Sequence, residues 1–103
     1  MKREQAVMLT IVAENILEEP LIELVDQAGA QGYSIVETSY GKGRHGIRTG
    51  SGSISSNIQM TLALPKETAE TILSAIEAKY GQLYAIRAFV QAVEMIHWTP
   101  KTV

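Results

Sequence analysis

The chain lacks cysteine and is poor in histidine and aspartate. Its 103 residues include two histidines, His45 and His97, and one aspartate, Asp26. The absence of cysteine excludes disulfides, thiolate metal ligands and cysteine nucleophiles. The remaining residues suggest no carboxylate pair, serine triad or metal-ligand cluster, so catalysis is the weaker hypothesis. We therefore expect a binding module with neither catalytic residues nor a metal site.

Charge and hydropathy narrow the class further. The net charge of −2 disfavours a general nucleic-acid binder. Residues 1–5 lead into an apolar run that is too short to span a membrane and lacks a signal-peptide cleavage site. We expect a cytoplasmic protein that does not insert into membranes. The length and the apolar fraction of 46% fit one globular domain spanning residues 1–103.

Hydrophobic periodicity predicts four strands and two helices. Two-residue alternation marks strands at 6–13, 33–40, 57–64 and 84–93. Apolar stripes mark helices at 15–28 and 65–80, with Asn15 a candidate N-cap and Pro65 opening the second helix. The order βαββαβ predicts an α+β, ferredoxin-like sandwich with an antiparallel sheet. Residues 94–103 either add a short edge strand or pack on a neighbour, and about 97–103 form a C-terminal tail.

The first predicted strand is apolar on both faces. Val7, Leu9 and Ile11 share one face, whereas Met8 and Val12 lie on the other. Such a strand needs cover on both sides, and a single layer of helices covers only one. We expect another subunit to supply the second cover.

A glycine-rich segment, residues 40–57, joins the second and third predicted strands. It holds five of the eight glycines together with Lys42, Arg44 and Arg48, and no carboxylate. Glycines let backbone N–H groups converge on a ligand, and cations favour phosphate or another oxyanion. The segment matches G-x-G-x-x-G, but a dinucleotide site also requires a helix to begin there, and no helical periodicity follows. A mobile anion-binding loop and a flexible solvated hairpin remain equally open.

Three segments resemble those of a known family. They are residues 32–38 (GYSIVET), 41–44 (GKGR) and 89–94 (FVQAVE). Together with the order of elements, they resemble the PII signal-transduction superfamily. The GYSIV run is closer to its PII-like branch, which includes regulators linked to bicarbonate transporters and carboxysomes. The likeness covers roughly residues 6–96 of the chain.

The resemblance implies a homotrimer of ferredoxin-like subunits without catalytic turnover. Adenine nucleotides would bind in the clefts between neighbours. The long loop between the second and third strands, the T-loop of the family (about residues 41–56), would respond to ligand and dock on a partner such as a bicarbonate transporter or a carboxysome-associated protein. The nucleotide-binding residues carried over by position are Thr38, Ser39, Gly41, Lys42, Gly43, Arg44, Arg48 and Arg87.

Departures from the family pattern narrow the expected ligand. Residues 84–86 (YAI) replace the glycine-rich segment before the phosphate-binding lysine, whose position Arg87 takes. The basic C-terminal segment is reduced to Lys101, and no tyrosine follows Tyr40 within the loop as a target for uridylylation. The cysteine pair of some relatives is absent. We therefore expect AMP, cyclic AMP or ADP in preference to ATP with magnesium, and bicarbonate as a co-ligand by analogy.

Other hypotheses share the same order of elements. A trimeric divalent-metal-tolerance protein of the CutA type has this architecture, but the missing cysteines and scarce histidines argue against it. An RNA-binding domain would need exposed aromatics on its central strands, where Asn57, Gln59 and Thr61 lie instead. A small enzyme and a scaffold domain with a flexible hairpin are the remaining alternatives.

Overall fold

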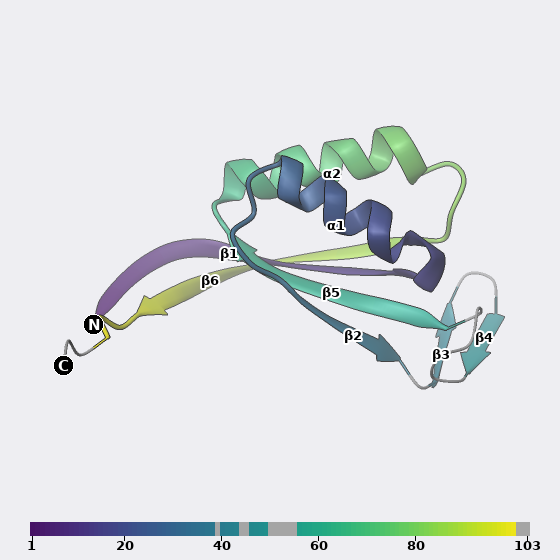
Figure 1. The fold of residues 1–103 in the computed structure, drawn as a ribbon, viewed down its shortest axis with the longest axis horizontal. Coiled ribbons are helices and arrows are strands. Elements are labelled where there is room, and N and C mark those ends of the chain that lie inside the picture. The colour runs from purple at the N-terminus through teal and green to yellow at the C-terminus, as the bar shows by residue number, and fades with distance from the viewer. Residues whose placement is uncertain (39, 44–45, 50–55, 101–103) are drawn as a thin grey trace.

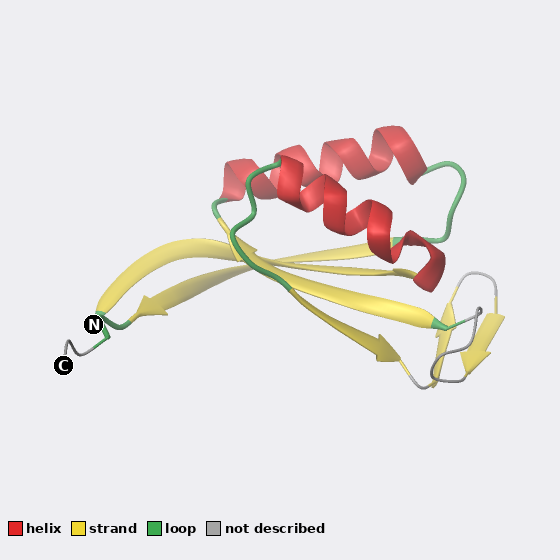
Figure 2. Cartoon of the chain, viewed as in Figure 1, coloured by secondary structure: helices red, strands yellow, loops and turns green. Residues whose placement is uncertain are grey.

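A four-stranded antiparallel sheet with two helices on one face forms the body of the protein (Figure 1). The computed structural model describes residues 1–38, 40–43, 46–49 and 56–100. The body consists of β1 (Lys2–Glu14), α1 (Glu18–Gln27), β2 (Ser34–Thr38), β5 (Asn57–Leu64), α2 (Lys66–Tyr80) and β6 (Arg87–His97). This order confirms the predicted βαββαβ sandwich, and Figure 2 shows both helices on the same side of the sheet.

The strands follow the order β2-β5-β1-β6, and each neighbouring pair is antiparallel. Consequently β1 and β5 are central, and β2 and β6 are the edge strands. Ile11 of β1 lies opposite Met60 of β5 on one side and Ala88 of β6 on the other. The predicted pairing of the second and third strands of the βαββαβ order is confirmed, because Ile35 of β2 also lies opposite Met60.

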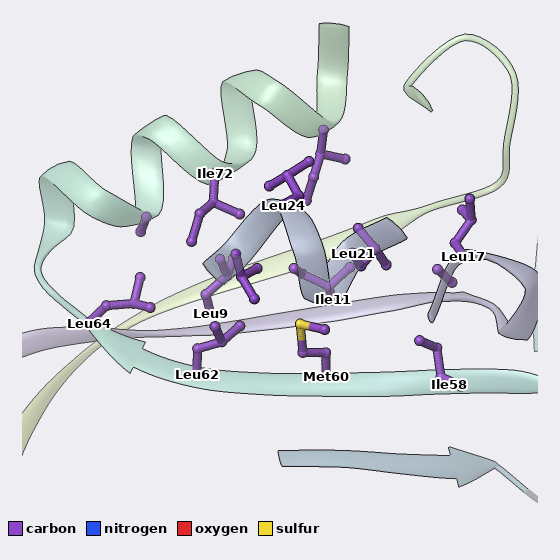
Figure 3. Packing of buried hydrophobic residues seen from close by; sticks show 14 of the residues in the cluster. Leu9, Ile11, Leu17, Leu21, Leu24, Ile58, Met60, Leu62, Leu64 and Ile72 are labelled. Atoms are coloured by element: carbon purple, nitrogen blue, oxygen red, sulfur yellow. The ribbon is translucent and has the colours of Figure 1, made fainter. Parts of the chain in front are cut away.

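The core lies between the sheet and the helices (Figure 3). Alternate residues of the central strands point toward the helices, and Leu9, Ile11 and Met60 are fully buried. The helices bury the apolar stripes that their three- and four-residue spacing predicts. The buried helical residues are Leu21, Leu24 and Val25 of α1 and Ala69, Ile72 and Ile76 of α2. The hydrophobic pattern therefore identified both the strand face and the helix faces that form the core.

Asn15 was expected to cap the first helix, whereas Pro20 predicted a start close to residue 17; α1 begins at Glu18, as Pro20 indicates. A 3-10 turn, η1 (Asn15–Leu17), precedes α1, and the N-cap of α1 is Leu17 rather than Asn15. The backbone N–H of Asn15 instead donates to the carbonyl of Ser56 at 2.9 Å, so this residue continues the hydrogen bonding between β1 and β5. Pro20 falls in the first turn of α1, where a missing N–H is tolerated.

Beyond the helices, β1 and β6 continue as a two-stranded ribbon, which extends away from the helices toward the N-terminus (Figure 1). We define the ribbon as residues 2–6 paired with 93–97. Lys2 lies opposite His97, so β1 starts before residue 6 and β6 ends after residue 93, the predicted limits. Arg3 forms a salt bridge with Glu94 at 2.5 Å. The segment after residue 93 thus lengthens β6 rather than forming a separate edge strand.

β6 also begins later than predicted, at Arg87 instead of residue 84. The N–H of Tyr84 donates to the carbonyl of Tyr80 at 3.1 Å, and the two rings meet edge to face with centroids 6.0 Å apart. Tyr84 thereby closes the turn that follows α2, so it is unavailable for sheet pairing.

The face of the sheet opposite the helices carries apolar side chains with little cover. We call it the open face. Phe89 and Val36 are 51% and 56% exposed, whereas Met8 and Val12 are half-buried. A hollow of about 620 Å³ on this face is lined by residues of β1, β5 and β6, among them Thr10 and Gln59. As expected from the first strand, one layer of helices leaves its second face uncovered in the single chain.

Within the described part of the chain, no helix is both long and apolar enough to cross a membrane.

Candidate functional site

The T-loop leaves and rejoins the sheet at one point. Thr38 ends β2, Asn57 begins β5, and these two residues are register partners. Asn57 is also the partner of Glu14, the last residue of β1. We call residues 37, 38, 56 and 57 the neck of the T-loop. The neck lies at the end of the sheet that is opposite to the ribbon (Figure 1).

Two side-chain hydrogen bonds connect the two sides of the neck. The Thr38 hydroxyl donates to the backbone carbonyl of Asn57 at 3.1 Å. The Ser56 hydroxyl donates to Oε1 of Glu37 at 2.5 Å. Hydrogen bonds to a carboxylate are shorter and about twice as strong as those between neutral groups. The neck is therefore held together by side chains as well as by the strand ladder.

The chain beyond the neck contains a small hairpin. Strands β3 (Tyr40–Gly43) and β4 (Gly46–Thr49) pair antiparallel as a second, two-stranded sheet. Gly41 lies opposite Arg48, and Lys42 lies opposite Ile47. The hairpin places the backbones of these predicted phosphate-binding positions on adjacent strands. Both described parts of the G-x-G-x-x-G segment are strands where a loop was expected, because they pair with each other as a hairpin. No helix begins within residues 40–43 or 46–49, which agrees with the rejection of a dinucleotide site.

Ser39, Arg44 and His45 lie outside the described residues, as do residues 50–55. Their assigned roles, and the mobility expected for the loop, therefore stay predictions.

Arg87 lies on the other edge of the sheet from the neck. It is the first residue of β6, it is exposed, and its partner across the strand pair is Val12. Since β5 and β1 separate β2 from β6, and strands are about 4.8 Å apart, Arg87 lies roughly 14 Å from Thr38 across the sheet. The strand order of a single subunit therefore separates Arg87 from Thr38, which begins the T-loop base (residues 38 and 40–43).

Thr38 and Arg87 nevertheless belong to the same face. Val12 and Glu14 alternate with Ala13, which is buried beneath the helices at 1% exposure. Val12 and Glu14 therefore point to the open face. The residues that pair with them on the neighbouring strands point to the same face. Thr38 shares this face through its register with Asn57, and Arg87 shares it through its register with Val12.

An ionisable pair in the ribbon lies far from the neck. Nε2 of His97 contacts Oε1 of Glu4 at 3.2 Å in the ribbon, at the far end of the sheet. Among the described residues, no group of three or more histidine or acidic side chains is arranged to hold a metal ion.

Glu37 and Ser56 are the neck residues that sequence reasoning missed. Ser56 is fully buried, unlike a serine in a solvated loop. A signal was present, because Ser56 continues the two-residue alternation of Ile58 and Met60, whose side chains face the core. Glu37 likewise continues the alternation that begins with Ile35. A polar residue at a core-facing position next to a loop would have indicated a side chain that bonds across the neck.

A ferredoxin-like sheet from which a T-loop extends between the second and third strands of the βαββαβ order is the architecture of PII-type signalling proteins. The profile of the nitrogen regulatory protein P-II family matches residues 6–99, and the chain belongs to this family. Proteins of this family are regulatory and non-enzymatic, so the chain is not an enzyme. The resemblance seen in the sequence is thereby confirmed.

Solved structures of PII-like proteins are similar over nearly the whole chain. A PII-like signalling protein from Thermus thermophilus is 32% identical, with 93% of this chain and 94% of that chain covered and a TM-score of 0.74. CPII from Thiomonas intermedia, bound to ADP, AMP and bicarbonate, is 27% identical with 91% of each chain covered and a TM-score of 0.82. CPII bound to ADP and bicarbonate is 28% identical, with the same coverage and a TM-score of 0.81.

Proposed function

We propose that this PII-like signalling protein is a homotrimer that binds an adenine nucleotide in the clefts between subunits, together with bicarbonate. AMP, ADP and cyclic AMP are the favoured nucleotides, and ATP is less favoured. The observation that carries this proposal is the similarity to CPII, which is 27–28% identical over 91% of both chains. The structures of CPII contain ADP and bicarbonate. The bound nucleotide would control a partner protein through the T-loop.

The separation of Arg87 from the T-loop base supports a site between subunits. Both Thr38 and Arg87 belong to the open face, but they lie on opposite edge strands. A neighbouring subunit that places its β6 edge beside β2 would bring its Arg87 to this T-loop base. The cleft would then combine an arginine from one chain with a glycine-rich loop from the next.

The open face supports assembly into a trimer. Phe89 and Val36 are about half exposed there. Met8 and Val12 also point to this face, which neither α1 nor α2 of the same chain covers. Removing apolar surface from water stabilises an interface by roughly 25 cal/mol per Å². Neighbouring subunits would supply the second layer that β1 needs.

The phosphates would bind at the T-loop base. Backbone N–H groups of Gly41 and Gly43 can point at phosphate oxygens, as glycine-rich turns do. Arg44 and Arg48 would offer bidentate guanidinium groups, and Lys42 would add a point charge. These residues, with Ser39, form the loop side of the site.

Two further residues complete the proposed site. The Thr38 hydroxyl already donates to Asn57, so Thr38 would offer its backbone or its hydroxyl oxygen as an acceptor. Arg87 would reach the phosphates from the neighbouring subunit.

Signalling would follow from the difference in nucleotide affinity between two arrangements of the T-loop. A ligand shifts such an equilibrium only by the amount by which it binds one arrangement better than the other. The partner that binds the T-loop would be a bicarbonate transporter or a carboxysome-associated protein. The PII-like protein itself would act in the cytoplasm. Nucleotide and bicarbonate would together report the energy and carbon state of the cell.

Calorimetry and mass measurement in solution test this proposal. We expect heat of binding for AMP, ADP or cyclic AMP at protein concentrations near 100 µM, which suits dissociation constants of roughly 1–100 µM. Adding bicarbonate should change the affinity for the nucleotide. Light scattering should give three times the 11.3 kDa chain mass. A monomer that releases no heat with any of these nucleotides would refute the proposal.

A further inference from the structure

The neck contains a fully buried serine whose side chain bonds to a charged group. Ser56 has 0% exposure, and its hydroxyl donates to Oε1 of Glu37 at 2.5 Å. Glu37 belongs to β2 on the entrance side of the T-loop, and Ser56 is the last residue of the loop on its exit side. This bond therefore joins the chain entering the loop to the chain leaving it.

Ser56 also connects the neck to the helical layer. Its backbone carbonyl accepts the N–H of Asn15 at 2.9 Å. Asn15 begins η1, which leads directly into α1. Three segments that are distant in the sequence, at residues 15, 37 and 56, thus meet at one serine. A movement of the loop exit would therefore displace both the end of β2 and the start of the first helix.

The two side-chain bonds of the neck lie on opposite faces of the sheet. Glu37 is the register partner of Ile58, which is buried beneath the helices, so Glu37 projects to the helix side. Thr38, the next residue, projects to the open face and bonds to Asn57. The neck therefore has a side-chain hydrogen bond on each face of the sheet. Together the two bonds oppose rotation of the loop about the strand direction.

The Ser56–Glu37 bond is separate from the strand ladder. Removing the hydroxyl leaves the backbone pairing of Thr38 with Asn57 and the bond from Asn15 in place. It also leaves a Glu37 carboxylate that is exposed and can be hydrated. The bond can consequently be removed while the backbone pairing at the neck stays in place.

We propose that Ser56 and Glu37 are positioning residues of the nucleotide site. Their hydroxyl–carboxylate bond fixes the exit of the T-loop against its entrance, and so holds the loop base in the arrangement that receives the phosphates. Neither residue need touch the nucleotide. This inference rests on the proposed function for its ligand, whereas its effect on the loop itself does not depend on any ligand.

The experiment compares Ser56→Ala, Glu37→Gln and the double variant with the wild-type protein. Matched controls are Ser34→Ala, an exposed serine in β2, and Glu70→Gln, an exposed glutamate in α2. Ser56→Ala should lower ADP affinity by up to about ten-fold, because losing a charge-assisted hydrogen bond lowers the population of the binding-competent loop arrangement by at most about that factor. Glu37→Gln should have a smaller effect, because the amide oxygen still accepts. The double variant should bind no more weakly than Ser56→Ala, and the controls should match the wild type.

A second measurement needs no ligand. Trypsin cleaves after Lys42, Arg44 and Arg48, and the rate at these sites reports how tightly the loop is held. Ser56→Ala should raise this rate about five-fold or more while cleavage in the helices stays slow, as expected for local opening. A purely structural role would instead raise cleavage throughout the chain and lower Tm without a specific loss of ADP affinity.

The outcomes separate the two ideas. If the wild type binds ADP and Ser56→Ala binds it equally tightly, the inference is overturned and the proposed function stands. If the wild type binds no nucleotide, the proposed function fails, and the ligand-free cleavage rates decide whether Ser56 holds the loop. Unchanged cleavage at the loop sites in Ser56→Ala overturns that role as well.

Discussion

Thr38 and Arg87 project onto the same face of one sheet but from its two opposite edge strands. Two strands lie between them, so the two positions are roughly 14 Å apart across the sheet. The strand order therefore does not place Arg87 beside a phosphate group that lies at Thr38 of the same subunit. If both residues contact the phosphates of one nucleotide, we expect them to come from two chains, and this expectation generates the first prediction.

Mixed trimers should restore a binding site that each parent variant lacks. Arg87→Ala and the double variant Arg44→Ala/Arg48→Ala should each weaken ADP binding about ten-fold or more through loss of a charge-assisted contact. When the two variants are unfolded together and refolded, some clefts combine an intact T-loop with an intact Arg87. Calorimetry should then recover a fraction of sites with wild-type affinity. Failure to recover any such site would place Arg87 and the T-loop of one chain in a single site, or Arg87 outside the site.

The T-loop arginines should matter for ligand but not for assembly. Arg44→Ala or Arg48→Ala alone should weaken nucleotides carrying phosphates, because a guanidinium fork to phosphate is lost. Adenosine, which has no phosphate, should bind the variants and the wild type alike. Light scattering should show an unchanged mass. A variant that falls to monomers would instead assign the arginine a structural role at the interface.

A charge on the open face should separate the subunits. Phe89 is 51% exposed on that face of β6, and replacing it with glutamate would bury a carboxylate in the proposed interface, which costs several kcal/mol when it is unpaired. Phe89→Glu should therefore lower the mass in solution toward that of a single chain. Leu83 is 76% exposed in the turn after α2, so Leu83→Glu is the matched control and should leave the mass unchanged. If Phe89→Glu and Leu83→Glu have the same mass in solution, the open face is not part of the interface.

Core truncation should destabilise each subunit strongly. Ile72 of α2 is fully buried against the sheet, and Ile72→Ala should lower the free energy of unfolding by about 2–5 kcal/mol. Ile16, 68% exposed in η1, gives the control Ile16→Ala, for which the change should stay within about 0.5 kcal/mol. Urea unfolding monitored by circular dichroism gives both values. Similar losses for the two variants would contradict the assignment of the core.

The sequence predicted those parts of the fold that local periodicity specifies. β5 was expected at residues 57–64 and occupies Asn57–Leu64, because Ile58, Met60, Leu62 and Leu64 alternate without interruption. The second helix was likewise expected from residue 65 to 80 and occupies Lys66–Tyr80. In both elements, the side chains that define the period are those that the core buries. Burial and local pattern therefore carry the same information.

Non-local pairing explains most of what the sequence missed. Residues 2–5 are polar or charged, so they resemble a loop, and they become a strand only because residues 94–97 pair with them. Asn15 resembled an N-cap, but it begins the 3-10 turn η1, and its N–H bonds to Ser56, which is distant in the sequence. A local pattern cannot show which distant residue will pair with a backbone donor.

The candidate site was predicted at the level of positions rather than of contacts. The family resemblance identified Thr38 and Arg87, and the register places them at the ends of β2 and β6. It did not identify Glu37 or Ser56, because their importance comes from a bond between two strands. The edge-to-edge separation of Thr38 and Arg87 likewise depends on strand order, which no single segment of sequence contains.

The ribbon has a practical consequence for engineering. Lys2 and His97 are partners at its tip, and β1 runs from there to the neck over 13 residues, which corresponds to about 40 Å. Residues 2 and 97 therefore lie next to each other and far from the neck of the T-loop. A fluorescent reporter or purification handle attached at the tip of the ribbon should leave the loop accessible to its partner. The same adjacency invites circular permutants, in which a short linker joins residues 2 and 97 and the chain opens in the turn between α2 and β6.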